Sequence, residues 1–542
     1  MSFKSPYPDV EIPELSLPDF IFGDIDPADL DRPALIDGAS GVATTYRTLI
    51  EQVHAIAGGL TAVGLRPGDV VGLHSVNLPA FAAAYHGILR AGGVVTTVNA
   101  LYTAEDVTNQ LRDGRAKFLF TNTALLPQAQ RAAAAAGIPA ERVYVLDPPD
   151  DGVPSLRSLI AQNSPAPELA DDSAEQLAVL PYSSGTTSKP KGVMLTHRNM
   201  VANVCQVNSV IGIDAADKIL AVLPFFHVYG MTMLLNTALR KRACLVTMPK
   251  FDLHEFLATV SRHRCTYMFI APPIAVALAK HPAVNDHDLS SVRVIFSGAA
   301  PLDRALGQAV AQRLGCRVRQ GYGMSEMSPV SHVIPADRDD IDLGSVGLTI
   351  PNMECKLVDP ATGEEIAVPT ERTSDMGELW CRGPNVMAGY LNNEQATADA
   401  VDAEGYLHTG DIATVDADGV VTIVDRVKEL IKYKGYQVAP AELEALLLTH
   451  PQVRDAAVIG AISDDGEEVP KALVVRADED NSLDETAVMK FVGDRVSPHK
   501  KIRIVDFIDE IPKSATGKIL RKELRAMGAI RGASTTKESR DS

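Results

Sequence analysis

Helix-like and strand-like segments alternate along the first part of the chain. Between residues 40 and 150, stretches such as YRTLIEQVHAIAGGLTAVGL carry apolar residues at helical spacing, and they alternate with β-branched runs such as DVVGLHSVN and GGVVTTVN. The Ala-rich segment QAQRAAAAAG predicts a further connecting helix that ends at Gly137. This rhythm is typical of βαβ units, and it resumes up to about residue 330. We therefore expect an α/β fold with mostly parallel strands.

The character of the sequence changes twice after this alternation. From about residue 345 to 425, short strands with Gly-rich turns dominate, as in GSVGLTI, GELWCRG and GVVTIVD, which predicts a small β-rich subdomain. The remaining chain is mixed α/β and rich in lysine. We therefore predict a large N-terminal domain over residues 1–425, with α/β subdomains and the β-rich subdomain, and a small α+β C-terminal domain over residues 426–542.

Composition excludes several classes of protein. Hydrophobic residues make up 46% of the chain and charged residues 22%, which is enough apolar material for sizeable cores. The formal charge of −18 has the wrong sign for a surface that holds nucleic-acid phosphates. No apolar run approaches the ~18 residues that a membrane-spanning helix needs. We expect no nucleic-acid partner and no stable membrane insertion, and a polyanionic ligand would have to meet a local basic patch.

The cysteines and the N-terminus bear on the compartment. The six cysteines are scattered without zinc or CxxC spacing, which suits a reducing environment. The N-terminal MSFKSPYPDVEIPELSLPDF has prolines and acids where a signal peptide requires an unbroken apolar segment. We therefore expect a cytoplasmic protein. Nothing in the sequence indicates an oligomeric state.

The strongest local signal is LAVLPYSSGTTSKPKG at residues 177–192. A short apolar strand runs directly into a loop of hydroxyls, glycines and lysines. Glycines let backbone N–H groups approach an anion, hydroxyls donate hydrogen bonds, and Lys191 could place a cation against a polyphosphate. The pattern differs from the P-loop GxxxxGK[ST]. A flexible surface loop is the alternative, but the preceding strand and the two lysines favour a phosphate cradle.

Two further glycine-containing segments follow predicted strands. In QGYGMSE, residues 320–326, the closely spaced glycines suit a flat base that stacks on backbone, and Glu326 could hold Mg²⁺. In SGAAPL, residues 297–302, small residues at the end of an apolar strand leave room for a ligand. Tight structural turns are the alternative for both segments.

Charged residues of the last third supply the other candidates. In HTGD, Asp411 could bind ribose hydroxyls together with Arg426, although a surface ion pair worth about 0–1 kcal/mol is the alternative. The lysine-rich DRVKELIKYKGYQVAP is the clearest candidate for the basic patch, or else a solvated face. Alone, Lys518 in PKSATGKIL would be a surface charge, and His227 in LPFFHVYG a buried core histidine.

In this order, the segments resemble the acyl-adenylate-forming superfamily of AMP-dependent synthetases and ligases over nearly the whole chain. The combination of LPFFHVYG, SGAAPL, GYGMSE, HTGD, VDRVKELIKYKGYQVAPAELE and PKSATGKILR is most similar to the 4-coumarate–CoA ligase branch. The resemblance implies a ligase that uses ATP and Mg²⁺ to convert a carboxylic acid to an acyl-AMP, then transfers the acyl group to CoA and releases AMP. It also implies that the C-terminal domain is mobile.

The resemblance favours 4-coumarate or a related aryl-acrylic acid as the substrate. A medium- or long-chain fatty acid and the loading of a free-standing carrier protein remain alternatives. A non-catalytic nucleotide-binding protein would be expected to lose Lys518, Glu326 or Lys191, and all three are present.

The resemblance also implies roles for individual residues. The nucleotide would be held by Ser183, Ser184, Gly185, Thr186, Thr187, Lys191, Ala299, Gln320, Gly321, Ser325, Asp411, Arg426, Lys428, Lys432, Gln437 and Lys518. The acid would be held by Tyr229, Met233, Gly298, Gly323, Pro329 and Val330. CoA would face Lys250, Lys434 and Gly435.

The remaining implied roles concern catalysis and motion. Lys518 would bridge the attacking carboxylate and the α-phosphate, Glu326 would lie near Mg²⁺, and His227 would swing to open the route for CoA. Lys428 lies at the family's hinge position, about which the small domain would rotate. The chain departs from the usual motifs at Ser188, which replaces a glycine, and at Ser325, which replaces a threonine and keeps the hydroxyl.

Overall fold

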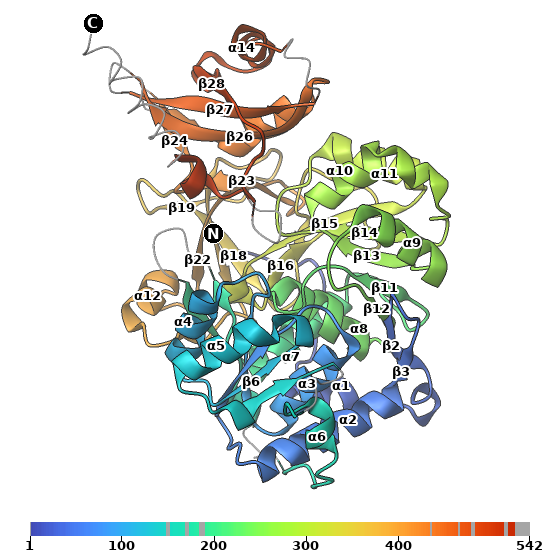
Figure 1. Ribbon diagram of the computed structural model, residues 1–542. Helices are drawn as coiled ribbons and strands as arrows, with labels where there is room; N and C mark the ends of the chain where they lie inside the picture. Colours follow the sequence, from blue (N-terminus) through green and yellow to red (C-terminus); the bar gives the residue numbers. More distant parts are fainter. Residues whose placement is uncertain are drawn as a thin grey trace, which may run out of the picture. The chain divides into compact units, whose positions relative to one another are not determined.

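The computed structural model describes residues 2–147, 152–168, 173–183, 190–433, 436–463, 467–477, 483–513 and 519–525 (Figure 1). The chain divides into two compact units. The larger unit consists of Phe3–Cys355 and Cys381–His408, and the smaller unit consists mainly of Lys356–Trp380 and the chain from Thr409 onward. The boundary between residues 425 and 426 stays a prediction.

The first sheet of the larger unit has eight strands in the order β21-β10-β8-β5-β4-β6-β7, with β9 paired to β10. The strands are β4 (Val70–His74), β5 (Val94–Val98), β6 (Phe118–Thr121), β7 (Val143–Val145), β8 (Leu177–Val179), β9 (Tyr182–Ser183), β10 (Lys191–Thr196) and β21 (Gly389–Tyr390). Strands β4 to β8 pair in parallel, as the alternating sequence predicts. Their side chains are almost all buried, because the connecting helices α3, α4 and α5 pack against the sheet.

Several helices of this region begin or end at a residue that caps them. They are α1 (Leu17–Phe22), α2 (Tyr46–Ala62), α3 (Pro79–Arg90), α4 (Ala104–Asp113), α5 (Leu126–Ala136), α6 (Leu156–Ile160) and α7 (His197–Asn208). Thr103 and Thr196 each form a capping box with the third residue of the following helix, α4 or α7. The predicted stop of α5 is confirmed, since Gly137 adopts a φ of 80° that only glycine adopts readily.

The second sheet of the larger unit has nine strands in the order β17-β16-β15-β14-β13-β11-β12-β2-β3. The strands are β2 (Pro33–Asp37), β3 (Ala43–Thr45), β11 (Lys218–Ala221), β12 (Cys244–Thr247), β13 (Tyr267–Ile270), β14 (Val294–Ser297), β15 (Arg317–Gly323), β16 (Val330–Val333) and β17 (Leu348–Thr349). The central pairs are parallel. Consequently, β14 and β15 deliver their carboxyl ends, SGAAPL and QGYG, to one edge.

Helices accompany this sheet as well. They are α8 (Thr237–Arg240), α9 (Leu253–His263), α10 (Pro272–Lys280) and α11 (Arg304–Leu314), and a π-helix covers Gly230–Asn236. In Figure 1, α10 and α11 lie side by side next to β13–β15. Helix α12 (Glu394–Ala400) follows β21 in the larger unit.

The third sheet has the strand order β1-β18-β20-β22-β23, with β19 paired to β18. The strands are β1 (Phe3–Lys4), β18 (Glu354–Val358), β19 (Glu365–Ile366), β20 (Gly377–Arg382), β22 (Leu407–Val415) and β23 (Val421–Arg426). Strands β18, β20 and β22 each contain a point at which the chain passes from one unit to the other, after Cys355, Trp380 and His408.

The rest of the smaller unit is α+β, as predicted. A hairpin of β24 (Ile431–Tyr433) and β25 (Tyr436–Val438) precedes a sheet of β26 (Val453–Ile462), β27 (Glu468–Arg476) and β28 (Ile504–Phe507), with helices α13 (Pro440–Leu448) and α14 (Glu485–Gly493). Leu443, Leu447, Val458, Val474 and Val488 belong to its core. Across the described residues, no helix has the length and apolar character that crossing a membrane requires. The cytoplasmic location stays a prediction.

Candidate functional site

Strand pairing brings the two ends of the predicted phosphate loop together. Strand β9 ends at Ser183 and β10 begins at Lys191, and these two residues are direct partners across the antiparallel β9–β10 pair. Ser183, with its hydroxyl, and Lys191, with its ammonium group, therefore flank the predicted loop at its two ends. The predicted residues Ser184, Gly185, Thr186 and Thr187 lie outside the described residues.

Glu326 forms the centre of a hydrogen-bonded cluster beside this loop. Its carboxylate is buried, and Oε1 accepts hydrogen bonds from Ser183 Oγ at 3.0 Å and from Tyr390 Oη at 2.8 Å. The Nζ atom of Lys191 lies 4.7 Å from the centre of the Tyr390 ring, within the range of a cation–π interaction. Tyr390 thus links the two predicted charged residues of the site.

The electrostatics of the cluster keep Tyr390 a donor. Burial, followed by the negative charge of Glu326, raises the pKa of the Tyr390 hydroxyl well above its usual value, so the phenol retains its proton. Both hydroxyls bond to Oε1, and Oε2 accepts from neither. A carboxylate oxygen of this kind fits Mg²⁺, which prefers oxygen ligands. Within the described ranges, no group of three or more His, Cys, Asp or Glu could hold a metal ion, so phosphate and water oxygens would have to complete such a site.

Tyr390 is not among the residues that the sequence predicts for the site. It lies on β21, which pairs antiparallel with β10, so that Val193 and Tyr390 are partners although far apart along the chain. The local sequence MAGYLNN contains only a Gly-Tyr pair, which is a weak signal by itself. Only the pairing of β21 with β10 identifies this residue.

The predicted nucleotide-bordering segments lie next to each other. Ser297 on β14 and Gln320 on β15 are partners in the parallel pair. The Gln320 side chain is buried, and its Oε1 accepts from Leu302 N at 3.1 Å, so β15 holds the SGAAPL segment in place. Ala299, in this segment, has a φ of 70°, which is uncommon for a residue with a side chain.

The turn after β15 presents the remaining candidates. A Cβ atom at Gly321 would lie 2.8 Å from His332 O, which explains why a glycine stands there. Ser325 is the first residue of the 3-10 helix Ser325–Met327, which carries Glu326. This short helix packs against β10, and its Glu326 bonds to Ser183 on β9.

The predicted acid-binding residues include two close contacts, one between Gly298 and Tyr229 and one between Gly323 and Pro329. A Cβ atom at Gly298 would lie 2.8 Å from Tyr229 Oη, which itself donates to Phe296 O at 3.3 Å. A Cβ atom at Gly323 would lie 2.0 Å from Pro329 O. The two glycines therefore make room for a tyrosine ring and for backbone. Met233, in the π-helix, and Val330 are buried near the same chain segments.

His227 precedes this π-helix. Its backbone N–H donates to Pro224 O at 3.1 Å, and its Nδ1 accepts from Tyr229 N at 3.2 Å. The side chain is half-buried. These bonds tie His227 to the segment that carries Tyr229.

In the smaller unit, Asp411 and Arg426 lie opposite each other on β22 and β23. Arg426 Nε lies 3.1 Å from Asp411 Oδ1, and the carboxylate is buried while the guanidinium is about one-third exposed. Thr409 Oγ1 donates to Leu379 O at 2.6 Å, and this bond fixes β22 two residues before Asp411. The structure thus pairs the two residues, and their role in binding ribose stays a prediction.

The remaining predicted residues are dispersed. Lys428 and Lys432 are exposed in the smaller unit, and Lys432 is the strand partner of Gln437. Lys250 is exposed in the larger unit. Lys434, Gly435 and Lys518 lie outside the described residues.

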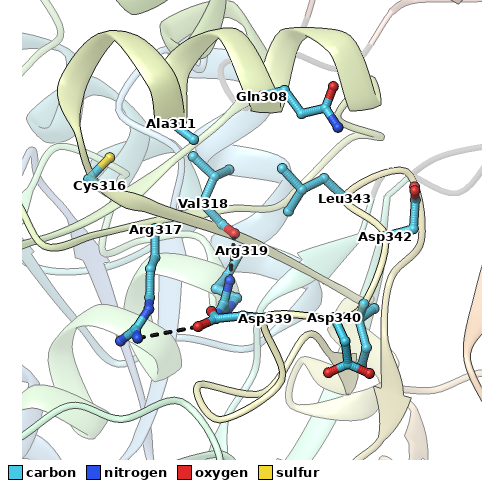
Figure 2. Close-up of a pocket in the computed structure, with 11 residues that line it drawn as sticks. Gln308, Ala311, Cys316, Arg317, Val318, Arg319, Asp339, Asp340, Asp342 and Leu343 are labelled. Carbon is cyan, nitrogen blue, oxygen red and sulfur yellow. Dashed lines mark hydrogen bonds and ion pairs between the residues drawn. The ribbon is translucent and has the colours of Figure 1, made fainter.

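A cavity of about 360 Å³ lies elsewhere on the larger unit, beside α11 and β15 (Figure 2). Arg317 and Arg319 both pair with Asp339, and Asp340 and Asp342 also line the cavity. Since these arginines are already paired, the cavity offers no unpaired cation to a phosphate. None of the predicted site residues lines it.

Comparisons with known proteins identify the family of the chain. A model of AMP-binding enzymes matches residues 27–391, and a model of the AMP-binding enzyme C-terminal domain matches residues 442–518. The chain is 40% identical to 4-coumarate–CoA ligase 3 of Oryza sativa subsp. japonica, over 97% of this chain and 94% of that protein. It is 40% identical to 4-coumarate–CoA ligase 2 of Petroselinum crispum, over 97% and 96%.

Solved structures give the same result. The anthranilate CoA ligase AuaEII in complex with anthranoyl-AMP is 26% identical, with a TM-score of 0.86 over 97% of this chain and 99% of that one. ATP-bound MatB from Rhodopseudomonas palustris is 28% identical, with a TM-score of 0.85 over 94% and 98%.

The fold and these matches define an adenylate-forming acid–CoA ligase. The chain belongs to the AMP-binding enzyme family, within its 4-coumarate–CoA ligase-like group. The predicted superfamily, fold class and AMP-forming acid–thiol ligase activity are thus confirmed, with a small-molecule acid, ATP and CoA as substrates.

Proposed function

We propose that this ligase activates an aryl-acrylic acid, with 4-coumarate as the representative substrate. The observation that carries the proposal is the full-length similarity to 4-coumarate–CoA ligases at 40% identity. Tyr229 lies against Gly298 and is in aromatic contact with Phe269, so an aromatic ring borders the predicted acid-binding segment.

The proposed chemistry follows from charge. A carboxylate must approach the α-phosphate of ATP, and both groups are anions, so cations have to neutralise them while pyrophosphate leaves. Lys518 would serve the attacking carboxylate, and Lys191 would serve the phosphates. Mg²⁺, when bound near Glu326, would reduce the charge of the phosphate oxygens. Ser183 and Tyr390 would hold the Glu326 carboxylate in place.

The other predicted residues would serve either adenylation or the transfer of the acyl group to CoA. Ala299, Gln320, Gly321, Ser325, Asp411 and Arg426 would bind the AMP portion, with Lys432 and Gln437 on the adenylate. Lys250, Lys434 and Gly435 would bind CoA. Rotation of the C-terminal domain about Lys428 would then exchange Lys518 for the CoA-binding face, and His227 would swing to open the thiol route.

The test measures each half-reaction with a panel of acids. Carboxylate-dependent exchange between ATP and pyrophosphate reports adenylation, and release of AMP on addition of CoA reports thioester formation. We expect faster turnover of 4-coumarate than of octanoate. Faster turnover of octanoate than of any cinnamate would reassign the enzyme to fatty acids, and exchange without CoA-dependent turnover would favour a carrier protein as acceptor.

A variant separates the two steps. Lys518→Ala should slow adenylation by about 10²–10³, the typical cost of losing one preorganised transition-state donor, and should spare thioester formation from premade acyl-AMP. Equal losses in both half-reactions would contradict the proposed division between Lys518 and the CoA-binding face.

A further inference from the structure

Two cysteines lie together where the chain passes between the two units. Cys355 on β18 and Cys381 on β20 are both fully buried, and their Sγ atoms are 3.6 Å apart. The two strands are neighbours in one sheet. Facing side chains on neighbouring strands have Cβ separations of ~4.5–5.5 Å, close to the ~3.5–4.5 Å of a disulfide, so small side-chain movements suffice for a bond.

The surroundings of Cys355 are polar on one side. His332 Nε2 lies 3.9 Å from Cys355 Sγ, and Thr349 Oγ1 lies 3.9 Å from it and 3.1 Å from the imidazole. Ser331 Oγ lies 2.9 Å from His332 Nδ1 and so orients the ring from its other side. Cys355 therefore has both a second thiol and an imidazole as neighbours.

This environment favours a thiolate at Cys355. Burial alone would raise the pKa of the Cys355 thiol, but its hydrogen bond with Cys381 and the charge and hydrogen bond of His332 outweigh burial and lower it. The other four cysteines behave oppositely, because burial raises their pKa values. Those of Cys205, Cys244 and Cys316 rise to about 11, and that of Cys265 rises to about 12.

We propose that Cys355 and Cys381 form a redox modification site, at which a hydroperoxide such as hydrogen peroxide converts the two thiols reversibly to a disulfide. The two sulfurs are buried, so only a small oxidant suits the site. Nothing in the adenylation chemistry uses either residue.

The oxidation proceeds in two balanced steps. The Cys355 thiolate attacks one peroxide oxygen, the O–O bond breaks, and the leaving hydroxide takes up a proton to form water, which leaves a sulfenic acid on Cys355. The Cys381 sulfur then attacks the Cys355 sulfur, the S–O bond breaks, and hydroxide leaves with the Cys381 proton as a second water. Two thiols are oxidised by the loss of two hydrogen atoms, and one peroxide is reduced to two waters.

The Cys355–Cys381 disulfide would join the two residues that flank a segment of the smaller unit. Residues Lys356–Trp380 belong to the smaller unit, whereas Cys355 and Cys381 belong to the larger one. A disulfide would therefore close this segment into a covalent loop at its base. The closed loop includes Leu379, whose carbonyl accepts the bond from Thr409 that fixes β22.

The test uses the reduced full-length protein and no substrate, so its result is independent of the proposed acid. Hydrogen peroxide is added, the chain is denatured in an alkylating reagent, and the proteolytic peptides are mapped by mass spectrometry. We expect the number of alkylated thiols to fall by two from six, a cross-linked peptide pair containing Cys355 and Cys381, and full recovery with dithiothreitol.

Variants supply the controls. Cys316→Ser should keep the cross-link, and Cys381→Ser should abolish it and leave Cys355 to be oxidised further to a sulfinic acid. Three results with the wild-type protein would each overturn the proposal. The first is six alkylated thiols at a peroxide concentration that oxidises free cysteine. The others are a cross-link between other cysteines, and sulfinic acid at Cys355 without a cross-link. The wild-type measurement alone decides the matter if a variant fails to fold.

Discussion

Tyr390→Phe tests whether the hydroxyl groups of Ser183 and Tyr390 position the carboxylate of Glu326, which we propose to lie near Mg²⁺. The substitution removes only the Oη atom, which donates to Glu326 Oε1 at 2.8 Å, and it keeps the ring over which Lys191 lies. Glu326 retains the bond from Ser183. The variant thus removes one of the two hydroxyl bonds to Oε1 and leaves the aromatic packing intact.

The expected effect can be derived from this single bond. A hydrogen bond to a buried charged group contributes about 1.5–3 kcal/mol, and each 1.4 kcal/mol corresponds to about a factor of ten in rate. If Glu326 must stay in place during adenylation, Tyr390→Phe should slow ATP–pyrophosphate exchange by about 10- to 100-fold. The Mg²⁺ concentration for half-maximal exchange should rise, because the carboxylate is less well oriented.

The assay is acid-dependent ATP–pyrophosphate exchange over a range of Mg²⁺ concentrations. Tyr7→Phe is the matched control, since Tyr7 Oη donates to the carboxylate of Asp337 at 2.6 Å in the same unit, away from Glu326. It should leave both the rate and the Mg²⁺ dependence unchanged. The reasoning is refuted if Tyr390→Phe keeps the wild-type Mg²⁺ dependence, or if Tyr7→Phe shifts it equally.

Three further predictions concern stability. Gly323→Ala should destabilise the fold by about 1–3 kcal/mol in urea unfolding, because the added methyl would meet Pro329 O at 2.0 Å; an unchanged midpoint would contradict this packing. Glu444→Gln should lower the free energy of unfolding by about 3–5 kcal/mol, because the largely buried Arg521 guanidinium loses the carboxylate that it binds at 2.6 Å. A loss below about 1 kcal/mol would mean that water replaces the Glu444 carboxylate. Burial lowers the pKa of His197 from 6.5 to about 4, and the neutral Nδ1 accepts a hydrogen bond from Leu17 N at 3.0 Å. Between pH 6.5 and pH 4 the unfolded chain therefore binds more protons at this residue than the folded chain does. The free energy of unfolding should therefore fall by about 2 kcal/mol between pH 6.5 and 5 on account of His197. In the His197→Asn variant, this contribution to the pH dependence of unfolding should be absent.

Local signals predicted the fold class and the motifs. The alternation of helical and strand periodicity depends on neighbouring residues, so the parallel sheets and the end of α5 at Gly137 could be predicted. The motifs around Lys191 and Glu326 are contiguous, and they identified the superfamily before any geometry was known.

Contacts between distant segments could not be predicted in this way. Tyr390 and Glu326 are 64 residues apart, and only the pairing of β21 with β10 brings them together. Gly298 and Gly323 look like space for a ligand in the sequence, whereas the structure fills that space with Tyr229 and with the backbone of Pro329. A glycine in a sequence does not reveal which atoms approach it.

The three points at which β18, β20 and β22 pass between the units limit how this enzyme can be divided into fragments. A cut after residue 425 would fall inside β23 and detach Arg426 from its partner Asp411. Neither fragment would then contain the complete Asp411–Arg426 pair. Exchange of parts with a related ligase should therefore transfer residues 356–380 and the chain from 409 onward together, as one set of grafted segments.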